Sequence, residues 1–310
     1  MLTGFILAAG FGTRLRPLTD HIPKALNTVC GKPLLERSLD FYRQNNITRI
    51  GVNAHHFPER LESFGRTSAI QFELFHETDK IRGTGGAFYF ARDFLSGTKT
   101  FFVSNVDIIA SIDLHALHEQ FLSHDCSAGL ITVPRQAEGS IRYNRKTGNF
   151  GGARGDPSAT GDYGDFIGMA FYKNEFLDCV EKDDFSIVPV WTRAAKRGQR
   201  VMVLEAHDIY WKDVGSFREL AQIHFDVLEK RITLSLPSDM IVDFDKKQAY
   251  LKSCSEKQIS SLGADVWCEA EGIPEGIFIE KSVIMKNAII PLKKQLANVL
   301  LTPWGEIKID

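Results

Sequence analysis

The amino-acid sequence predicts an α/β fold in which a mostly parallel β-sheet carries helices on both faces. Two observations lead to this prediction. Short apolar runs that are typical of buried strands alternate with longer stretches of helical character, which is the pattern of β-α-β units. Glycine-rich or acidic segments directly follow several of these apolar runs, at the end of the strand where parallel sheets bind their ligands.

The expected elements follow one another along the first half of the chain. Strands are expected at residues 4–9, 47–53, 70–75, 100–103 and 128–133. Helices are expected at residues 34–45, 58–64, 86–94 and 114–123. In the first of these helices Leu35, Leu39 and Tyr42 share one face, which gives the helix an apolar side to pack on the sheet.

Composition and charge narrow the class of protein. The 310 residues suffice for one large domain and an appendage, and 44% hydrophobic with 25% charged residues is ordinary for a globular protein. A net charge of −2 gives no reason to expect binding to nucleic acid or to a membrane surface. The apolar start lacks a basic flank and is followed by glycines, so neither a signal peptide nor a membrane span is expected. Five scattered cysteines without a C-x-x-C pattern indicate reduced thiols and a cytoplasmic location.

The first strand leads into a loop suited to anions. Glycines at positions 10 and 12 let backbone N–H groups approach a ligand closely, and Arg14 and Lys24 add two separated cations. The dinucleotide-binding fingerprint is excluded because Leu15 stands where a third glycine is needed, and the G-K-[ST] of a P-loop is missing. The loop therefore predicts a site for a triphosphate and a second phosphate.

The segment LAAGFGTRLRPLT…PKAL resembles the signature of the sugar-1-phosphate nucleotidylyltransferases. The matching positions are Ala8, Ala9, Gly10, Gly12, Arg14, Pro17, Pro23 and Lys24. The resemblance implies a Rossmann-like nucleotidyltransferase domain that joins an NTP to a sugar 1-phosphate and releases pyrophosphate. It implies nucleotide contacts from Leu7, Ala8, Ala9, Gly10, Gly12, Thr13 and Arg14. It also implies that Arg14 holds the leaving pyrophosphate, while Lys24 bridges the sugar phosphate and the α-phosphate as the second catalytic residue.

Two aspartates are candidate magnesium ligands. Asp107 follows the apolar run FFVSN, and Asp213 lies in WKDVGS, which resembles the family's W-x-D-[VI]-G-[ST] segment. Carboxylate oxygens suit Mg²⁺ beside phosphates, whereas an aspartate after a strand can also simply cap a turn. Where the family usually has N-G-D, this chain has Val106 in place of the glycine, which affects the expected sugar contacts more than the metal.

A second glycine cluster lies in HETDKIRGTGGAFYFA. Gly83, Gly85 and Gly86 precede a helix that is expected to begin near Ala87, and three glycines there favour close approach of a ligand. By the resemblance this loop receives the base and ribose of the nucleotide. Glu77 is a candidate contact to the base or ribose, or alternatively a solvated loop acid.

The sugar pocket is less defined. Asn105 and Gly168 are the expected sugar contacts by the resemblance, and the glycine-rich stretch 151–165 is either a mobile lid or a solvated loop. The spacing of VNAHHFPE and WKDVGS looks closest to N-acetylmuramate-1-phosphate uridylyltransferases and mannose-1-phosphate guanylyltransferase-like proteins. The sugar is therefore expected to be of the mannose or N-acetylmuramate type.

The catalytic domain is expected to span residues 1–230, followed by a β-rich appendage at residues 231–310. Within the appendage, Ile273, Ile279 and Met285 recur at a spacing of six, and so do Ile277, Val283 and Ile289, together with the small residues Gly276, Ser282 and Ala288. This pattern resembles a single coil of a left-handed β-helix, with a β-meander as the alternative. One coil cannot bury its own faces, so the appendage is expected to pack on the main domain or to form a homo-oligomer.

Charge dictates the expected chemistry. A sugar phosphate is already a nucleophile at neutral pH, so the reaction needs positioning and charge neutralisation rather than a general base. The alternative of another class is a catalytically silent sugar-nucleotide-binding regulatory subunit. It is disfavoured because Arg14, Lys24, Asp107 and Asp213 are all retained. A dinucleotide oxidoreductase is opposed by the missing third glycine.

Overall fold

In the computed structural model, which describes residues 2–309, contacts divide the chain into two compact units. One unit contains the chain up to Phe11 together with Ser38–Trp211. The other contains Gly12–Arg37 together with the chain from Lys212 onward. These units are defined by contacts and not by domains, so the predicted domain boundary near residue 230 stays a prediction. The division into units shows that the segment after the first strand associates with the C-terminal part of the chain.

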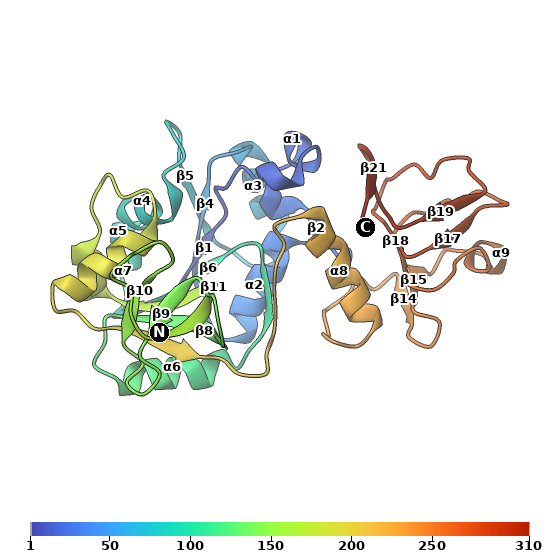
Figure 1. Ribbon diagram of the computed structural model, residues 1–310. Coiled ribbons are helices and arrows are strands. Elements are labelled where there is room, and N and C mark those ends of the chain that lie inside the picture. Colours follow the sequence, from blue (N-terminus) through green and yellow to red (C-terminus); the bar gives the residue numbers. More distant parts are fainter. Residues whose placement is uncertain (1, 310) are drawn as a thin grey trace. The chain divides into compact units, whose positions relative to one another are not determined.

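The first unit alternates strands and helices (Figure 1). Its strands are β1 (Thr3–Leu7), β4 (Arg49–Ala54), β5 (Glu73–His76), β6 (Thr100–Asn105), β7 (Ile108–Ser111), β8 (Ala128–Arg135), β9 (Ile141–Tyr143), β10 (Phe150–Ala153), β11 (Asp162–Lys173) and β12 (Val201–Glu205). Its helices are α3 (Pro58–Thr67), α4 (Gly83–Phe90), α5 (Arg92–Leu95), α6 (Leu114–Ser123), η3 (Asn174–Cys179) and α7 (Ile187–Lys196). Helix α2 (Leu34–Gln44) and strand β13 (Tyr210–Asp213) cross from one unit to the other.

A nine-stranded sheet forms the centre of this unit. Its path runs β10-β9-β11-β6-β1-β4-β5, and β8 joins β11 to β12. Strand β1 pairs in parallel with both β4 and β6, β4 pairs in parallel with β5, and β11 is antiparallel to β6 and β8. The predicted α/β fold with a mostly parallel central sheet is confirmed, and the loop after β1 leaves the sheet between two parallel neighbours.

Helices cover both faces of the sheet because successive strand residues point to opposite sides. On one face Phe101 packs in a core with α4, α5 and α7, which includes Phe88 and Trp191. On the other face Phe102 contacts Tyr42 of α2, with ring centroids 5.4 Å apart. The rings of Phe171 and Phe121 of α6 stack on that same side. The aromatic pair Phe101–Phe102 therefore anchors both helical layers.

Several predicted boundaries differ from the structure. Strand β5 begins at Glu73, three residues later than expected, and helix α4 begins at Gly83, so that the glycines expected before the helix lie inside it. The helical stretch also breaks at Ala91 into α4 and α5. Part of the stretch 151–165 belongs to β10 and β11 at the sheet edge, so it is not a loop throughout.

The second unit combines the segment after β1 with the C-terminal chain. Its helices are η1 (Thr13–Leu15), α1 (Leu18–His21), η2 (Lys24–Leu26), α8 (Phe217–Leu228) and α9 (Glu256–Ile259). Its strands are β2 (Thr28–Val29), β3 (Lys32–Pro33), β14 (Met240–Asp243), β15 (Gln248–Leu251), β16 (Val266–Cys268), β17 (Phe278–Glu280), β18 (Ser282–Ile284), β19 (Gln295–Ala297), β20 (Val299–Thr302) and β21 (Gly305–Lys308). The segment expected to be a long loop is thus a series of short helices and a small hairpin.

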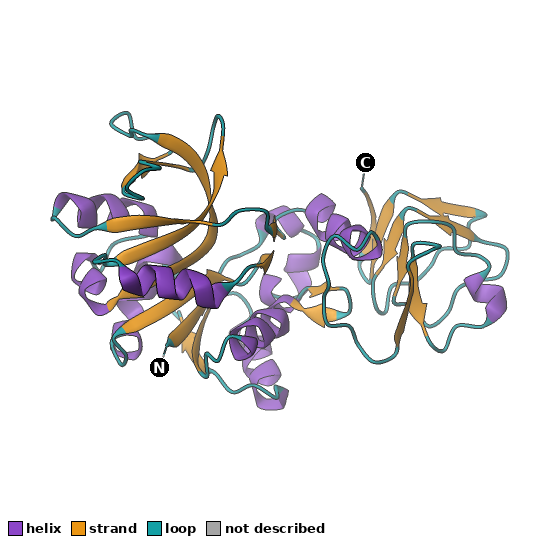
Figure 2. Ribbon diagram, turned by 90° about the horizontal axis from the view of Figure 1, so that it is seen from below, coloured by secondary structure: helices purple, strands orange, loops and turns teal. Residues whose placement is uncertain are grey.

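Strands β14–β21 form most of the C-terminal part, with α9 at its edge (Figure 2). Parallel pairing places Val266 beside Ser282, Val283 beside Leu300, and Phe278 beside Gln295. A β-meander, which is antiparallel, does not describe this stack, whereas the left-handed β-helix coil stays a prediction. All predicted hexad hydrophobics are buried except Ile289, which is 83% exposed.

The C-terminal chain holds the β2–β3 hairpin in place. The backbone N–H of Cys30 donates to Nε2 of the buried His224 in α8 over 2.9 Å. The guanidinium of Arg37 donates to the carbonyls of Val29 and Ser235. The His21 and Trp304 rings stack with centroids 4.9 Å apart. The C-terminal chain therefore packs on the segment that carries Lys24, within the same compact unit.

No helix in the described residues 2–309 is long and apolar enough to cross a membrane. The five cysteines are free thiols, and all are buried.

Candidate functional site

The carboxyl ends of β1 and β6 bring several predicted site residues together in the first unit. Leu7 pairs in register with Asn105, and the N–H of Val106 donates to the Leu7 carbonyl over 3.1 Å. Asn105 also lies beside Gly168, where an added Cβ would stand 2.9 Å from the Asn105 Nδ2 atom. Gly168 has φ +79° at an irregularity of β11, so it requires glycine. The two predicted sugar contacts are thus neighbours.

The side chain of Asn53, for which no role was predicted from the sequence, connects Ala8 and Glu77. The N–H of Ala8 donates to Asn53 Oδ1 over 2.6 Å, and Asn53 Nδ2 donates to Glu77 Oε1 over 2.8 Å. The other carboxylate oxygen of Glu77 accepts from the N–H of Arg82 over 2.7 Å. Glu77 is completely buried. The alternative of a solvated loop acid is therefore wrong, and both oxygens already have protein donors.

The glycines of α4 face the protein's own backbone. A Cβ on Gly83 would lie 2.1 Å from the carbonyl oxygen of Phe185, and one on Gly85 would lie 2.9 Å from the Ser186 carbonyl oxygen. Gly86 has similarly little room beside Asp184. Packing against residues 184–186 already requires these three glycines, so their presence does not indicate the predicted close approach of a ligand. Their contact with a nucleotide stays a proposal.

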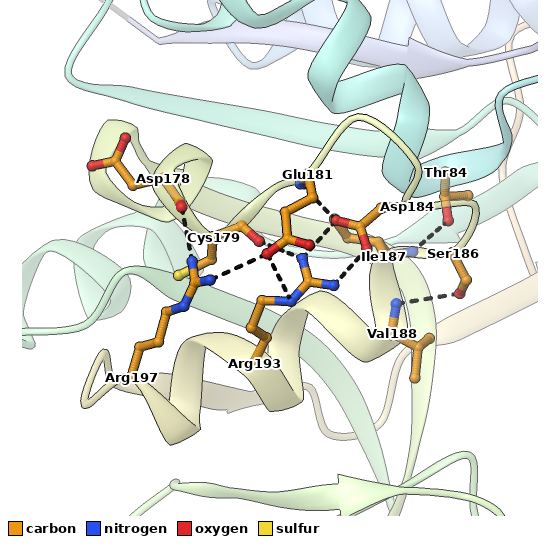
Figure 3. A network of polar contacts seen from close by, with 10 residues as sticks. All are labelled: Thr84, Asp178, Cys179, Glu181, Asp184, Ser186, Ile187, Val188, Arg193 and Arg197. Carbon is orange, nitrogen blue, oxygen red and sulfur yellow. Dashed lines mark hydrogen bonds and ion pairs between the residues drawn. The ribbon is translucent and has the colours of Figure 1, made fainter.

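The segment that packs on these glycines is held by a network of charged residues (Figure 3). Arg193 of α7 binds both carboxylate oxygens of Asp184, each over 2.7 Å, and donates to the Cys179 carbonyl. This hydrogen bonding by Arg193 lowers the pKa of the Asp184 carboxyl. Glu181 bridges Arg193 and Arg197, at 3.6 Å and 3.1 Å. The network fixes the loop on which the start of α4 rests.

In the second unit Gly12 lies directly against Lys24. Gly12 has φ +63°, and an added Cβ would stand 2.8 Å from Thr19 Cγ2 and 3.1 Å from Lys24 Cβ. The Thr19 hydroxyl donates to the Gly12 carbonyl over 2.9 Å. Lys24 is only 9% exposed. The compact turn therefore requires Gly12 for its conformation and places a buried cation further along the same segment.

Arg14 and Asp213, also in the second unit, form an ion pair. Arg14 Nη2 lies 3.8 Å from Asp213 Oδ2, and the two side chains are 68% and 45% exposed. A Cβ on Gly215 would lie 2.5 Å from Arg14 Nη2, so the glycine leaves the space that the guanidinium occupies. Two residues of the W-x-D-[VI]-G-[ST] segment thus contact Arg14: Asp213 pairs with its guanidinium, and Gly215 leaves room for it.

Asp107 belongs to the first unit and Asp213 to the second, so the convergence of their carboxylates stays a prediction. In the described part of the chain no group of three or more His, Cys, Asp and Glu side chains is arranged to hold a metal. Mg²⁺ bound with substrate phosphates typically needs only one or two carboxylates. The partly exposed carboxylates of Asp107 and Asp213 fit that requirement in their chemistry.

Two features of this region had no clear signal in the sequence. Asn53 ends an apolar run, and its position opposite Glu77 depends on the neighbouring strands β4 and β5. Asp184 lies just before α7 and Arg193 lies in the last turn of that helix, and their role depends on contacts with a helix far earlier in the chain. For Asn53, its position as a polar residue at the end of a predicted parallel strand was the one available indication of a role near the site.

Comparison with known proteins identifies relatives that match 69–71% of the chain. The model of the family described as nucleotidyl transferase matches residues 3–143. An N-acetylmuramate alpha-1-phosphate uridylyltransferase of Neisseria meningitidis is 30% identical over 229 residues, which cover 71% of this chain and 96% of that protein.

Other relatives are more distant or longer. A mannose-1-phosphate guanyltransferase beta-B of Xenopus laevis is 26% identical over 224 residues, which cover 69% of this chain. The matched region spans only 61% of that guanyltransferase's length. A solved structure titled as a putative glucose-1-phosphate thymidylyltransferase from Bacillus anthracis has a TM-score of 0.63 at 22% identity, covering 76% of this chain and 98% of the other. That likeness supports the fold.

Proposed function

Because this chain belongs to the nucleotidyl transferase family, we propose that it transfers a nucleotidyl group from an NTP to a sugar 1-phosphate. The products are an NDP-sugar and pyrophosphate. The observation that carries the proposal is the segment from Leu7 to Lys24, which begins at the end of central strand β1 and holds the signature positions. Its two cations suit the two phosphate-bearing substrates.

Charge neutralisation is the main task of such a site. Two unit charges of the same sign 4 Å apart repel by about 4 kcal/mol at an effective dielectric constant near 20. By the resemblance, Arg14 holds the leaving pyrophosphate, and Lys24 lies between the sugar phosphate and the α-phosphate. The nucleotide contacts proposed are the backbone from Leu7 to Gly10, Gly12, Thr13 and the start of α4. No general base is required, because the sugar phosphate oxygen carries its negative charge already.

Magnesium is part of the proposal. Asp107 and Asp213 are proposed as its protein ligands on the basis of the resemblance and of their carboxylate chemistry. When bound, Mg²⁺ neutralises negative charge on the triphosphate and on the departing pyrophosphate. The pairing of Asp213 with Arg14 keeps that carboxylate close to a proposed pyrophosphate-binding cation.

Asn105 and Gly168 are the proposed sugar contacts, and their close approach in the first unit supports a common role. The printed names of the relatives suggest two substrate pairs to test first. These are UTP with N-acetylmuramate 1-phosphate and GTP with mannose 1-phosphate. A cytoplasmic location accompanies the proposal as an expectation.

The test is pyrophosphate release on a grid of ATP, CTP, GTP, UTP and dTTP against several sugar 1-phosphates with Mg²⁺. One pair should stand out in kcat/KM, with the matching NDP-sugar as second product. Absence of turnover across the grid, combined with tight binding of an NDP-sugar, would instead support a silent regulatory subunit. Absence of both turnover and nucleotide binding would contradict both alternatives.

A homo-oligomer formed through the C-terminal chain is a further part of the proposal. Two large apolar side chains, Ile289 and Leu292, are 83% and 93% exposed there. Apolar side chains so open to water are typical of surfaces that contact another molecule when they occur together.

A further inference from the structure

A continuous chain of hydrogen bonds crosses the carboxyl ends of three adjacent parallel strands. It starts at the N–H of Ala8, just after β1, passes through the side chain of Asn53 in β4, and reaches Glu77, just after β5. It ends at the N–H of Arg82, the residue before α4. The three hydrogen bonds measure 2.6, 2.8 and 2.7 Å.

The first two hydrogen bonds of this network are buried, and the one at Arg82 is partly buried. Asn53 is 2% exposed, Ala8 is 5% exposed and Glu77 is not exposed at all. Nδ1 of His55 lies 2.7 Å from the Glu77 carbonyl oxygen and so contacts the same residue through its backbone. A buried polar network of this kind is stabilising only when every member is satisfied, since one unpaired group there is costly.

The direction of each bond is fixed by the residue types. Asn53 accepts from Ala8 through Oδ1 and donates to Glu77 through Nδ2. Both oxygens of Glu77 act as acceptors, one from Asn53 and one from the Arg82 backbone. A glutamine at position 77 would have only one acceptor to offer. An aspartate at position 53 would set two carboxylates against each other.

We propose that Asn53 and Glu77 are positioning residues that hold the Ala8 segment and the start of α4 at a fixed separation for the nucleotide. This inference rests on the proposed function, which assigns nucleotide contacts to both segments. A ligand that contacts two backbone segments gains affinity when their spacing is fixed in advance. Glu77 then acts through Ala8 and Arg82, with its own carboxylate kept from the nucleotide.

The residue types allow a sharp test in the double variant Asn53→Asp with Glu77→Gln. The carboxylate introduced at position 53 accepts from the Ala8 N–H and from the new amide. The amide introduced at position 77 donates to that carboxylate, and its oxygen accepts from the Arg82 N–H. The double variant thus keeps all three hydrogen bonds, but the bond between positions 53 and 77 runs in the opposite direction. Each single change breaks one of the three hydrogen bonds. Glu73→Gln is the matched control, because it makes the same chemical change on an exposed side chain of β5.

The measurements are NTP dissociation constants, KM and kcat, and amide hydrogen exchange at Ala8 and Arg82 without ligand. Each single variant should weaken NTP binding by about tenfold, the loss expected for one buried hydrogen bond to a charged group. KM for the NTP should rise more than kcat falls, and exchange at Ala8 or Arg82 should speed up. The double variant should recover both properties, and Glu73→Gln should match the wild type.

Two results would overturn the inference. The first is a double variant that binds every NTP no more tightly than the single variant with the lower NTP affinity. That result would indicate that Glu77 contacts the nucleotide directly. Single variants with faster exchange but unchanged NTP affinity would reduce the network to a structural role. If the wild-type protein binds NTP but releases no pyrophosphate, the proposed function fails, while the binding and exchange measurements still decide this inference.

Discussion

Arg14 and Asp213 face each other across 3.8 Å in the second unit, although each is proposed to act on a different partner in the reaction. The Arg14 side chain is 68% exposed and the Asp213 side chain 45%, and a partly exposed pair of this kind contributes about 0–1 kcal/mol. The pair can therefore open readily when the guanidinium meets a phosphate and the carboxylate meets a cation. Its position depends on Gly215, which leaves room for the arginine.

Replacement of Gly215 by alanine tests this arrangement. The added Cβ would stand 2.5 Å from Arg14 Nη2, and a flexible guanidinium can move away without disturbing the backbone. We expect kcat/KM for pyrophosphate release to fall by roughly tenfold, as for the loss of one charged hydrogen bond. Stability in urea should change by less than about 1 kcal/mol. Wild-type kinetics in a folded Gly215→Ala protein would show that the position of Arg14 is unimportant.

Lys24→Ala should affect turnover more than nucleotide affinity. The lysine is 9% exposed beside Gly12, so packing restrains its side chain and holds its charge in one position. Loss of a charge that neutralises the reacting phosphates typically lowers kcat by about 10²–10³-fold. Steady-state kinetics and equilibrium NTP binding are the measurements. Lys182→Ala, an exposed lysine, is the control. Reduced NTP affinity with unchanged kcat would move Lys24 out of the reaction centre.

Stability should depend on pH through His224. Burial lowers the pKa of this histidine to about 4 from an ordinary value of 6.5, and its Nε2 accepts from the Cys30 N–H. Between pH 6.5 and about 4 this histidine is protonated in the unfolded chain but neutral in the folded chain. The free energy of unfolding therefore decreases as the pH falls towards 4. The total loss from this group is about 3 kcal/mol.

Urea unfolding from about pH 7 to pH 4 measures this dependence. His224→Gln should be less stable at neutral pH but should show a flatter slope between pH 6.5 and about 4. His115→Gln, at a mostly exposed position on α6, should keep the wild-type slope. An identical slope in the His224 variant and the wild type would rule out this histidine as the source.

The sequence predicted the sheet better than it predicted the site. Local apolar runs and their alternation with helices predicted the strand positions and a mostly parallel sheet, and β1, β4, β6 and β8 lie close to their expected positions. The order of the strands was not predicted and comes from the structure alone. The glycines of α4 were misread because their packing partner, residues 184–186, lies far along the chain. The pairing of Asn53 with Glu77 likewise depends on two strands meeting in space, which no local pattern encodes. Long-range packing, rather than local preference, decides such details.

Exposed apolar residues provide a test of the proposed homo-oligomer. Replacing both Ile289 and Leu292 by glutamate should cost little stability, because neither side chain is buried in the described chain. If the chain associates through this surface, the sedimentation coefficient should drop to that of the monomer. Leu122→Glu, which changes an exposed leucine of the first unit, should leave the association unchanged. A wild-type protein that sediments as a monomer at all concentrations would contradict the proposal.

The metal proposal is tested by Asp107→Asn and Asp213→Asn. Each change keeps the shape of the side chain but removes a negative oxygen ligand. We expect kcat to fall by orders of magnitude in each single variant, with little further loss in the double variant, because both residues act through one ion. EDTA should abolish wild-type activity, and added Mg²⁺ should restore it.

Magnesium titrations separate this role from the pairing with Arg14. If Asp213 acts as a ligand, the Mg²⁺ concentration for half-maximal rate should rise in Asp213→Asn, and Asp107→Asn should show the same shift. Gly215→Ala, which disturbs Arg14 but leaves both carboxylates in place, should keep the wild-type Mg²⁺ dependence. If Asp213 mattered only by orienting Arg14, its variant would follow Gly215→Ala in both rate and Mg²⁺ dependence. Near-wild-type turnover in either folded aspartate variant would remove that residue from the metal site.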